Sequence, residues 1–267
     1  MDIIQSMWIG PRLSTMESMC IASYLRHGHP FHLYVYQNTE NVPEGTTVLD
    51  ANEIVPSSKI FTYAGRSFGR GSYAGFADLF RYKLLHTKGN WWVDTDSFCL
   101  RPFCFPGKEY VFSSEWSPPP YGFHPNCGNL RAASAKSDVY GWLCEQTATI
   151  NTMMAWGTIG PALIKQAIER FRLERYVAAP AVFCPVLYDE DAVNVIGPTA
   201  RLVSMAGTLR SAHWQASDSY AVHLWNEAWR MKGIDKDGAF DPHSVYESLK
   251  RQYRRTVVPE AVDAPSV

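Results

Sequence analysis

Apolar residues along the chain recur with two different spacings. Short, nearly continuous apolar runs bounded by Gly, Pro or polar residues predict strands. These runs occupy residues 3–9, 31–37, 46–55, 91–93 and 109–116. Segments with apolar residues three and four positions apart predict amphipathic helices. These segments occupy residues 15–28, 76–86 and 159–171.

The alternation of strands and helices predicts an α/β fold with a mostly parallel central sheet flanked by helices. The first helix also has boundary signals, because Ser14 and Glu17 are spaced as a capping box and Gly28 ends the segment. The length of 267 residues is sufficient for a large core. Residues 117–128 are predicted to form a long loop, and residues 221–229 are predicted to end the ordered core.

Composition excludes several classes of function. Hydrophobic residues make up 46% and charged residues 19%, and the net charge of −1 provides no basic field that would attract nucleic acid. No stretch approaches the roughly 20 apolar residues of a membrane span, and the N-terminus lacks signal-peptide features. The six cysteines have no metal-type spacing and predict free thiols. We therefore expect a cytoplasmic protein, attached at most peripherally to the inner face of the membrane through the basic start of a flexible tail, residues 251–267.

The segment GNWWVDTDSFCLRP, residues 89–102, places two carboxylates directly after an apolar strand. Asp94 and Asp96 are two positions apart, so on an extended chain their side chains point the same way. Ligands of α/β sheets bind beyond the carboxyl ends of the strands, and carboxylates suit Mg²⁺ or Mn²⁺, which also bind substrate phosphates. Aspartyl phosphatases share this pattern. They usually continue with Gly where this chain has Ser97, and they need a further acidic segment, for which residues 235–241 are a poor candidate that we interpret as a loop.

A second polar pair precedes the two carboxylates. Asp78 and Arg81 are three residues apart and share one face of the predicted helix. They are compatible with an ordinary intrahelical ion pair, worth only a few tenths of a kcal/mol. They are equally compatible with two side chains that point into a cleft and bind sugar hydroxyls. The spacing alone does not choose between these readings.

The whole segment GFADLFRYKLLHTKGNWWVDTDSFCLRP, residues 75–102, resembles the DXD-containing glycosyltransferases. That family includes capsule and lipopolysaccharide sugar transferases, α1,4-galactosyl- and N-acetylglucosaminyltransferases, and the core of the large glucosylating bacterial toxins. The opening strand, a polar segment around Asn126, a Gly-Pro helix start and a closing His-x-Trp also resemble it, in the same order. Asn90 replaces the second Gly of a Gly-Gly turn, which Asn tolerates because it visits the left-handed conformation. The strand Trp-Trp-Val replaces aliphatic-Tyr-aliphatic.

The resemblance implies a GT-A fold in a single catalytic domain, residues 1–250. Residues 1–105 would form the nucleotide-sugar-binding half, and residues 106–250 the acceptor half and C-terminal closure. It implies a retaining hexosyltransferase that uses a UDP-sugar donor, Mn²⁺ or Mg²⁺ as cofactor, and a glycan or lipid-linked acceptor, in bacterial surface polysaccharide synthesis. A non-catalytic nucleotide-sugar-binding module is the second hypothesis.

The resemblance also implies roles for individual residues in binding the donor. Trp8 would stack on the uracil, and Asp94 would bind ribose and sugar hydroxyls. Asp78 and Arg81 would hold the transferred sugar. The complete predicted nucleotide-sugar-binding set is Trp8, Ile9, Gly10, Asp78, Arg81, Asp94, Thr95 and Trp225.

A metal would be held beside the donor. The resemblance implies that Asp96 ligates it together with Asp94, and that His223 or Asn226 completes the set, without choosing between the two. The predicted catalytic set is Asp78, Arg81, Asp94, Asp96 and Asn126.

Four further residues receive weaker interpretations. Glu115 and Trp116 follow an apolar strand and are candidates to face the acceptor. His27 and His29 match nothing in the family pattern, and we predict surface positions for both.

Overall fold

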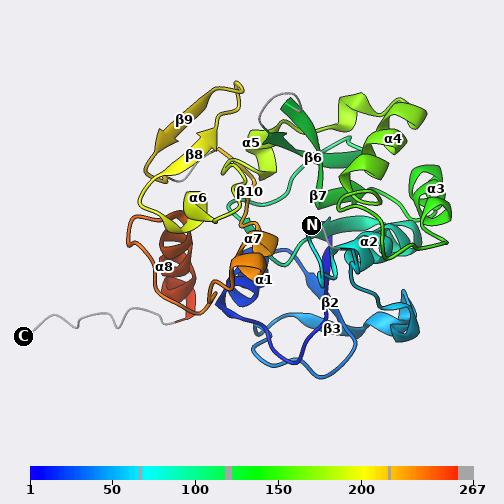
Figure 1. Ribbon diagram of the computed structural model, residues 1–267, viewed down its shortest axis with the longest axis horizontal. Helices are drawn as coiled ribbons and strands as arrows, with labels where there is room; N and C mark the ends of the chain where they lie inside the picture. Colours follow the sequence, from blue (N-terminus) through cyan, green and yellow to red (C-terminus); the bar gives the residue numbers. More distant parts are fainter. Residues whose placement is uncertain (66–67, 118–121, 216–217, 258–267) are drawn as a thin grey trace, which may run out of the picture.

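The computed structural model describes residues 1–65, 68–117, 122–215 and 218–257, and a six-stranded sheet forms its centre (Figure 1). The strand order is β3-β2-β1-β4-β7-β6. The first four strands are mutually parallel, and β7 pairs antiparallel with β4 and with β6. The strands are β1 (Ile4–Trp8), β2 (Phe31–Val35), β3 (Thr47–Asp50), β4 (Asn90–Val93), β6 (Tyr110–Ser117) and β7 (Gly122–Ala132).

Helices cover both faces of this sheet. One face packs against α2 (Ala74–Lys88), α3 (Asp138–Gln146) and α4 (Pro161–Phe171). The other packs against α1 (Thr15–Arg26), α5 (Pro180–Phe183), α6 (Val193–Ile196), α7 (Asn226–Lys232) and α8 (Val245–Val257). Short 3-10 helices cover Ala51–Glu53, Ser57–Lys59 and Glu174–Tyr176. The predicted α/β fold with a mostly parallel sheet flanked by helices is therefore confirmed.

Burial on both faces explains the continuous apolar runs in the sequence. In β4, Trp91 and Val93 belong to one core and Trp92 to the other, because alternate side chains of a strand point to opposite faces. All three are at most 1% exposed. Asn90, the first residue of β4, has a φ of 66°. This is the left-handed conformation expected at a position where the family pattern has Gly.

A small second sheet brings the C-terminal third of the chain to the end of β4. Strand β5 (Ser97–Cys99) pairs antiparallel with β10 (Ala221–His223), and Ser97 lies opposite His223. A hairpin of β8 (Ala200–Val203) and β9 (Leu209–Ala212) lies on the same side of the molecule as α8 (Figure 1). The β5–β10 pairing positions His223 beside the two carboxylates that follow β4.

Several sequence predictions about individual segments hold. Helix α1 begins with the capping box of Ser14 and Glu17. Residues 233–241 contain no helix or strand, as predicted for residues 235–241. The six cysteines are free. None of the helices in the described ranges is long and apolar enough to cross a membrane.

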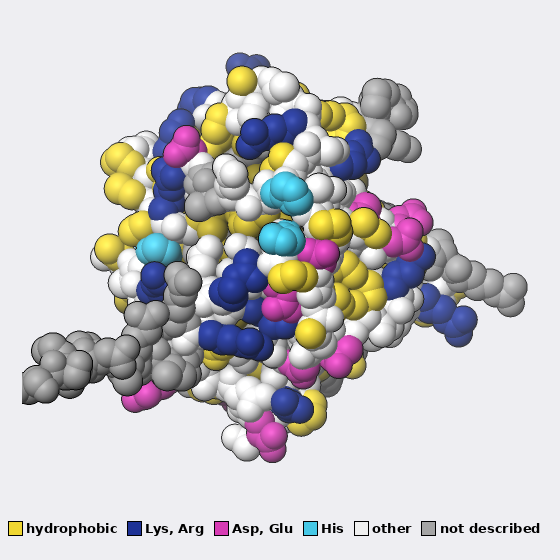
Figure 2. Space-filling model, turned by 90° about the vertical axis from the view of Figure 1, so that its left-hand side faces the viewer, with side chains coloured by type: hydrophobic (Ala, Val, Ile, Leu, Met, Phe, Trp, Pro, Cys, Tyr) yellow, Lys and Arg dark blue, Asp and Glu magenta, His cyan; other side chains and the backbone are white. Residues whose placement is uncertain are grey.

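On the side that carries β8, β9 and α8, Figure 2 shows Lys and Arg side chains in groups with acidic side chains between them.

Three predictions about the chain are wrong. Residues 122–128 do not form a loop but begin strand β7, while residues 118–121 lie outside the described residues. The ordered core does not end at residue 229, because α8 buries three apolar side chains against it. The predicted flexible tail begins too early, since residues 251–257 continue α8; residues 258–267 lie outside the described residues.

The surface prediction for His29 is also wrong. Its side chain is 2% exposed, its Nε2 accepts the backbone N–H of Phe103 at 2.9 Å, and its Nδ1 lies 3.1 Å from the carbonyl oxygen of Asp2. His29 therefore joins two segments that are far apart in sequence, which the local pattern does not reveal. His27 is half-buried.

Candidate active site

A cavity of about 870 Å³ opens at the carboxyl ends of β1 and β4. Every predicted site residue except Gly10 lines it: Trp8, Ile9, Asp78, Arg81, Asp94, Thr95, Asp96, Asn126, His223, Trp225 and Asn226. Gly10 lies beside it, with φ 154° and a position where an added Cβ would be 3.0 Å from Nε1 of Trp8. The positive φ and the close approach of that ring both favour glycine at this position.

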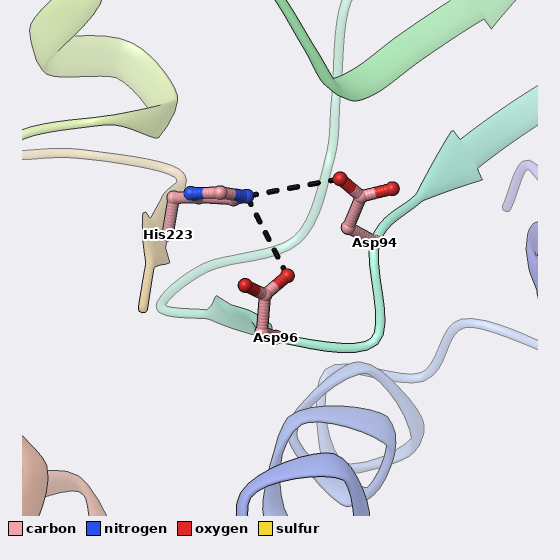
Figure 3. A group of neighbouring side chains, drawn as sticks. All are labelled: Asp94, Asp96 and His223. Carbon is pink, nitrogen blue, oxygen red and sulfur yellow. Dashed lines mark ion pairs between the residues drawn. The ribbon is translucent and has the colours of Figure 1, made fainter. Parts of the chain in front are cut away.

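Three ligating side chains converge on one point of the cavity wall (Figure 3). Nε2 of His223 lies 3.7 Å from Oδ2 of Asp94 and 3.5 Å from Oδ1 of Asp96. Asp96 and His223 are 6% and 7% exposed. Within the described part of the chain, neither ring nitrogen of His223 has a hydrogen-bond partner. A buried polar group without a partner is costly, so this imidazole is suited to a ligand.

The second oxygen of each carboxylate is held by the protein. Oδ1 of Asp94 accepts the indole N–H of Trp92 at 2.8 Å and lies 3.2 Å from Nη2 of Arg81. Oδ2 of Asp96 accepts the backbone N–H of Asn226 at 2.7 Å. Each carboxylate therefore keeps one oxygen fixed and presents the other toward the imidazole. The strand sequence Trp-Trp-Val stands where the family pattern has aliphatic-Tyr-aliphatic. It therefore places an indole at residue 92 that orients the Asp94 carboxylate.

The charges of the triad influence one another. Burial raises the pKa of Asp96. Burial would also raise the pKa of Asp94, but Arg81 and His223 outweigh it and hold that pKa below its usual range. Burial lowers the pKa of His223, but the negative charges of Asp96 and Asp94 outweigh this effect and raise it to about 8. At neutral pH the imidazole is therefore largely protonated, unless a cation takes the place of the proton.

Asp78 and Arg81 form the intrahelical ion pair of the first reading, and both side chains also reach the cavity. Nε of Arg81 lies 3.5 Å from Oδ1 of Asp78 within helix α2, and both side chains line the cavity. Arg81 also donates to the carbonyl of Cys127, and its guanidinium lies 4.9 Å from the ring centre of Trp92. Burial raises the pKa of Asp78 to about 7, although Arg81 opposes the shift. At neutral pH the Asp78 carboxyl can thus both accept and donate a hydrogen bond.

The cavity has an excess of negative charge. Its lining includes the carboxylates of Asp78, Asp94, Asp96, Glu115, Glu190 and Glu227. The permanently cationic side chains of the same lining are Arg81, Arg230 and Lys236. Carboxylates held this close together favour binding of a cation. Within this lining, the carboxylates at the exit of β4 group with an imidazole around one point.

The two candidates for the third metal ligand have different surroundings in the structure. The side-chain oxygen of Asn226 accepts from Nζ of Lys236 at 3.1 Å, whereas His223 faces the carboxylates. Lys236 also forms an ion pair with the buried Glu17 and lies 5.5 Å from the ring centre of Trp8. Sequence reasoning missed Lys236, because its place in the cavity depends on a partner 219 residues away.

A strand irregularity directs further polar groups into the cavity. Phe112 of β6 faces Leu130 of β7 and Ser114 faces Pro125, so residues 126–129 lie opposite a single residue of β6. Bulges of this kind bend a strand and re-aim its side chains. Beside this bulge, Glu115 lines the cavity as expected for an acceptor-facing residue.

Trp116 was the other candidate to face the acceptor, and its side chain is directed elsewhere. It is packed against the cluster of Ala181, Leu187 and Val203 and is not part of the cavity lining. Adjacent residues of a strand point to opposite faces, so Glu115 and Trp116 cannot both face the cavity.

The acidic loop near the C-terminus does not join the triad. Oδ1 of Asp237 accepts from the backbone and hydroxyl of Thr15, and Oδ2 lies 3.9 Å from Arg12. Among the described residues, the acidic and imidazole ligands that group around one point are those of Asp94, Asp96 and His223. The additional acidic segment that an aspartyl phosphatase needs is therefore not supplied by Asp237.

Comparison with known proteins gives only weak likenesses. No family model matches the chain, and no curated protein matches it in sequence. One similar solved structure is described as the PaToxG glycosyltransferase, with 13% identity over 64% of this chain and 69% of that chain, at a TM-score of 0.45. Another is described as a transferase mutant, with 8% identity over 64% of this chain and 85% of that chain, at a TM-score of 0.42.

Proposed function

We propose that this protein is a metal-dependent glycosyltransferase that moves a hexose or N-acetylhexosamine from a UDP-sugar to a hydroxyl of an acceptor. The observation that carries the proposal is the convergence of Asp94, Asp96 and His223 at the end of β4, inside a cavity of about 870 Å³. The cavity falls within the roughly 300–1,000 Å³ range of small-molecule sites.

The residues of the triad fit a divalent cation. Asp94 and Asp96 each direct one oxygen toward Nε2 of His223, so the group offers a cation two oxygens and one nitrogen. Carboxylates suit Mg²⁺ and Mn²⁺, whereas imidazole suits transition metals, so this mixed set favours Mn²⁺. When bound, such an ion supplies Lewis-acid stabilisation of the negative charge that develops on a diphosphate leaving group.

The other lining residues are suited to the rest of the donor. Asp78 and Arg81 lie on α2 beside the triad, and we assign them to the hydroxyls of the transferred sugar, where they fix its anomeric carbon for attack. Trp8, at the end of β1, is half-buried and lines the cavity, and we assign its ring to stacking on the uracil. Stacking of a base on an aromatic ring is worth about 1–3 kcal/mol.

The family resemblance adds three parts to the proposal. They are retention of anomeric configuration, a glycan or lipid-linked acceptor, and a role in bacterial surface polysaccharide synthesis. A cytoplasmic location with peripheral membrane attachment belongs to it in the same way. NMR analysis of the product tests retention directly, because an inverted anomeric carbon would contradict it.

Mn²⁺-dependent hydrolysis of UDP-sugars tests the function itself. We expect wild-type protein to be stabilised by Mn²⁺ with UDP and to hydrolyse at least one of UDP-glucose, UDP-galactose and their N-acetyl forms. Asp96→Asn removes one charge from the triad and should abolish both effects. A protein that hydrolyses no UDP-sugar but keeps Mn²⁺-dependent UDP binding would be a binding module. Turnover of a simple phosphomonoester, lost in Asp94→Asn, would indicate a phosphatase.

A further inference from the structure

The carboxylate of Glu115 is held in a fixed orientation on the wall of the cavity. Its Oε1 lies 2.8 Å from Nε2 of His124, and its Oε2 accepts from Nδ2 of Asn126 at 2.6 Å. The amide of Asn126 cannot turn without losing a bond, since its Oδ1 accepts the backbone N–H of Gly128 at 2.6 Å. Glu115, with a side chain 17% exposed, is thus oriented by two partners from β7.

This orientation leaves the carboxylate able to bind a substrate. An ionised carboxylate can accept about four hydrogen bonds, and the contacts with β7 account for two. The remaining capacity is on the side of the cavity that Glu115 lines. Asn126 follows His124, the residue opposite Glu115, by two positions on β7, so both side chains lie on the face that Glu115 occupies.

Glu115 belongs to a different part of the wall from the triad. It projects from β6, whereas Asp94, Asp96 and His223 lie at the ends of β4 and β10. The amide that holds Glu115 nevertheless lies next to the triad, because a Cβ added at Gly128 would be 2.8 Å from Oδ1 of Asn126 and 3.0 Å from Nε2 of His223. The hydroxyl that attacks the donor has to lie between the transferred sugar and the remaining wall of the cavity.

We propose that Glu115 binds the attacking hydroxyl and accepts its proton, an inference that rests on the proposed function. The oxygen of the hydroxyl forms a bond to the anomeric carbon while the bond from that carbon to the diphosphate oxygen breaks. The electron pair of the broken bond leaves with the diphosphate, and the hydroxyl proton passes to the Glu115 carboxylate. Removal of this proton is required whichever face of the sugar is attacked. His124 and Asn126 act as positioning residues for the carboxylate.

Hydrolysis of the UDP-sugar tests this role without a known acceptor, because water then supplies the attacking hydroxyl. Glu115→Gln keeps the shape of the side chain and removes its basicity. We expect its hydrolysis rate to fall about 100-fold or more, the usual contribution of a general base, with Mn²⁺-dependent stabilisation by UDP unchanged. Glu115→Asp keeps the charge on a shorter side chain and should recover part of the rate. Glu109→Gln removes an exposed carboxylate next to the start of β6, outside the cavity lining, and is the matched control, for which we expect the wild-type rate.

The outcomes separate this role from the proposed function. Hydrolysis by Glu115→Gln within about threefold of the wild-type rate would overturn the role of Glu115 alone, since such a change is far below the contribution of a general base. Loss of Mn²⁺-dependent UDP binding in Glu115→Gln would also overturn it, in favour of a donor-binding role. Failure of wild-type protein both to bind UDP with Mn²⁺ and to hydrolyse any UDP-sugar would overturn the proposed function, and this inference with it.

Discussion

Binding of Mn²⁺ should compete with a single proton on His223. The charges of Asp96 and Asp94 raise the pKa of this buried imidazole to about 8, and a ligating histidine has to be neutral. Protonation therefore weakens metal binding below pH 8, up to about tenfold for each pH unit. Between pH 8 and pH 6 the apparent Kd for Mn²⁺ should rise about 50-fold, the ratio that one proton with this pKa produces.

Isothermal titration of the protein with Mn²⁺ at pH 6, 7 and 8 measures this dependence. Titrations in two buffers of different ionisation enthalpy at pH 7 should show release of about one proton for each ion bound. His223→Ala should bind Mn²⁺ more weakly and lose most of the pH dependence between pH 7 and 8. An apparent Kd for wild-type protein that differs by less than about twofold between pH 6 and 8 would refute the assignment of His223 as a ligand. Such a result would show that Mn²⁺ binding does not displace a proton from the imidazole.

Three further changes test the surroundings of the triad. An added Cβ at residue 160 would lie 2.6 Å from Oδ2 of Asp78, so Gly160→Ala should displace that carboxyl and reduce UDP-sugar hydrolysis. Full activity of this variant in a steady-state assay would contradict the expected displacement. Trp92→Phe removes a hydrogen bond to a charged group, and thermal denaturation should show a loss of about 1.5–3 kcal/mol. The hydrogen bond to Glu115 raises the pKa of His124, so Glu115→Gln should lower that pKa in an NMR titration; an unchanged value would show that the two side chains do not interact in solution.

The part of the site that follows local rules could be predicted from the sequence. Asp94 and Asp96 follow an apolar strand directly, and Asp78 and Arg81 share one face of a helix. Each of these placements depends only on the period of a strand or a helix, and the structure brings all four side chains into one cavity. The choice between His223 and Asn226 could not be made, because it depends on the pairing of β10 with β5.

The parts that were mispredicted depend on contacts between distant segments. His29 resembles a loop residue in sequence but is buried because Phe103 and Asp2 surround its ring. The bulge in β7 follows from how that strand pairs with β6, and a Pro- and Gly-containing sequence around Pro125 hid the strand altogether. Helix α8 was missed because its polar residues dominate the pattern, whereas the few apolar ones supply its packing.

The β5–β10 pairing means that the triad joins two segments that lie far apart in the sequence. Asp94 and Asp96 belong to the sheet, whereas His223 arrives on a strand more than a hundred residues later. An ion bound between them would connect the last third of the molecule to the sheet. It would stabilise this pairing by an amount that grows with the logarithm of its free concentration once that concentration exceeds Kd. Chelation should then increase hydrogen exchange in residues 221–232 well before it affects β1, β2 and β4. Availability of the ion would in this way set how often the C-terminal segment opens.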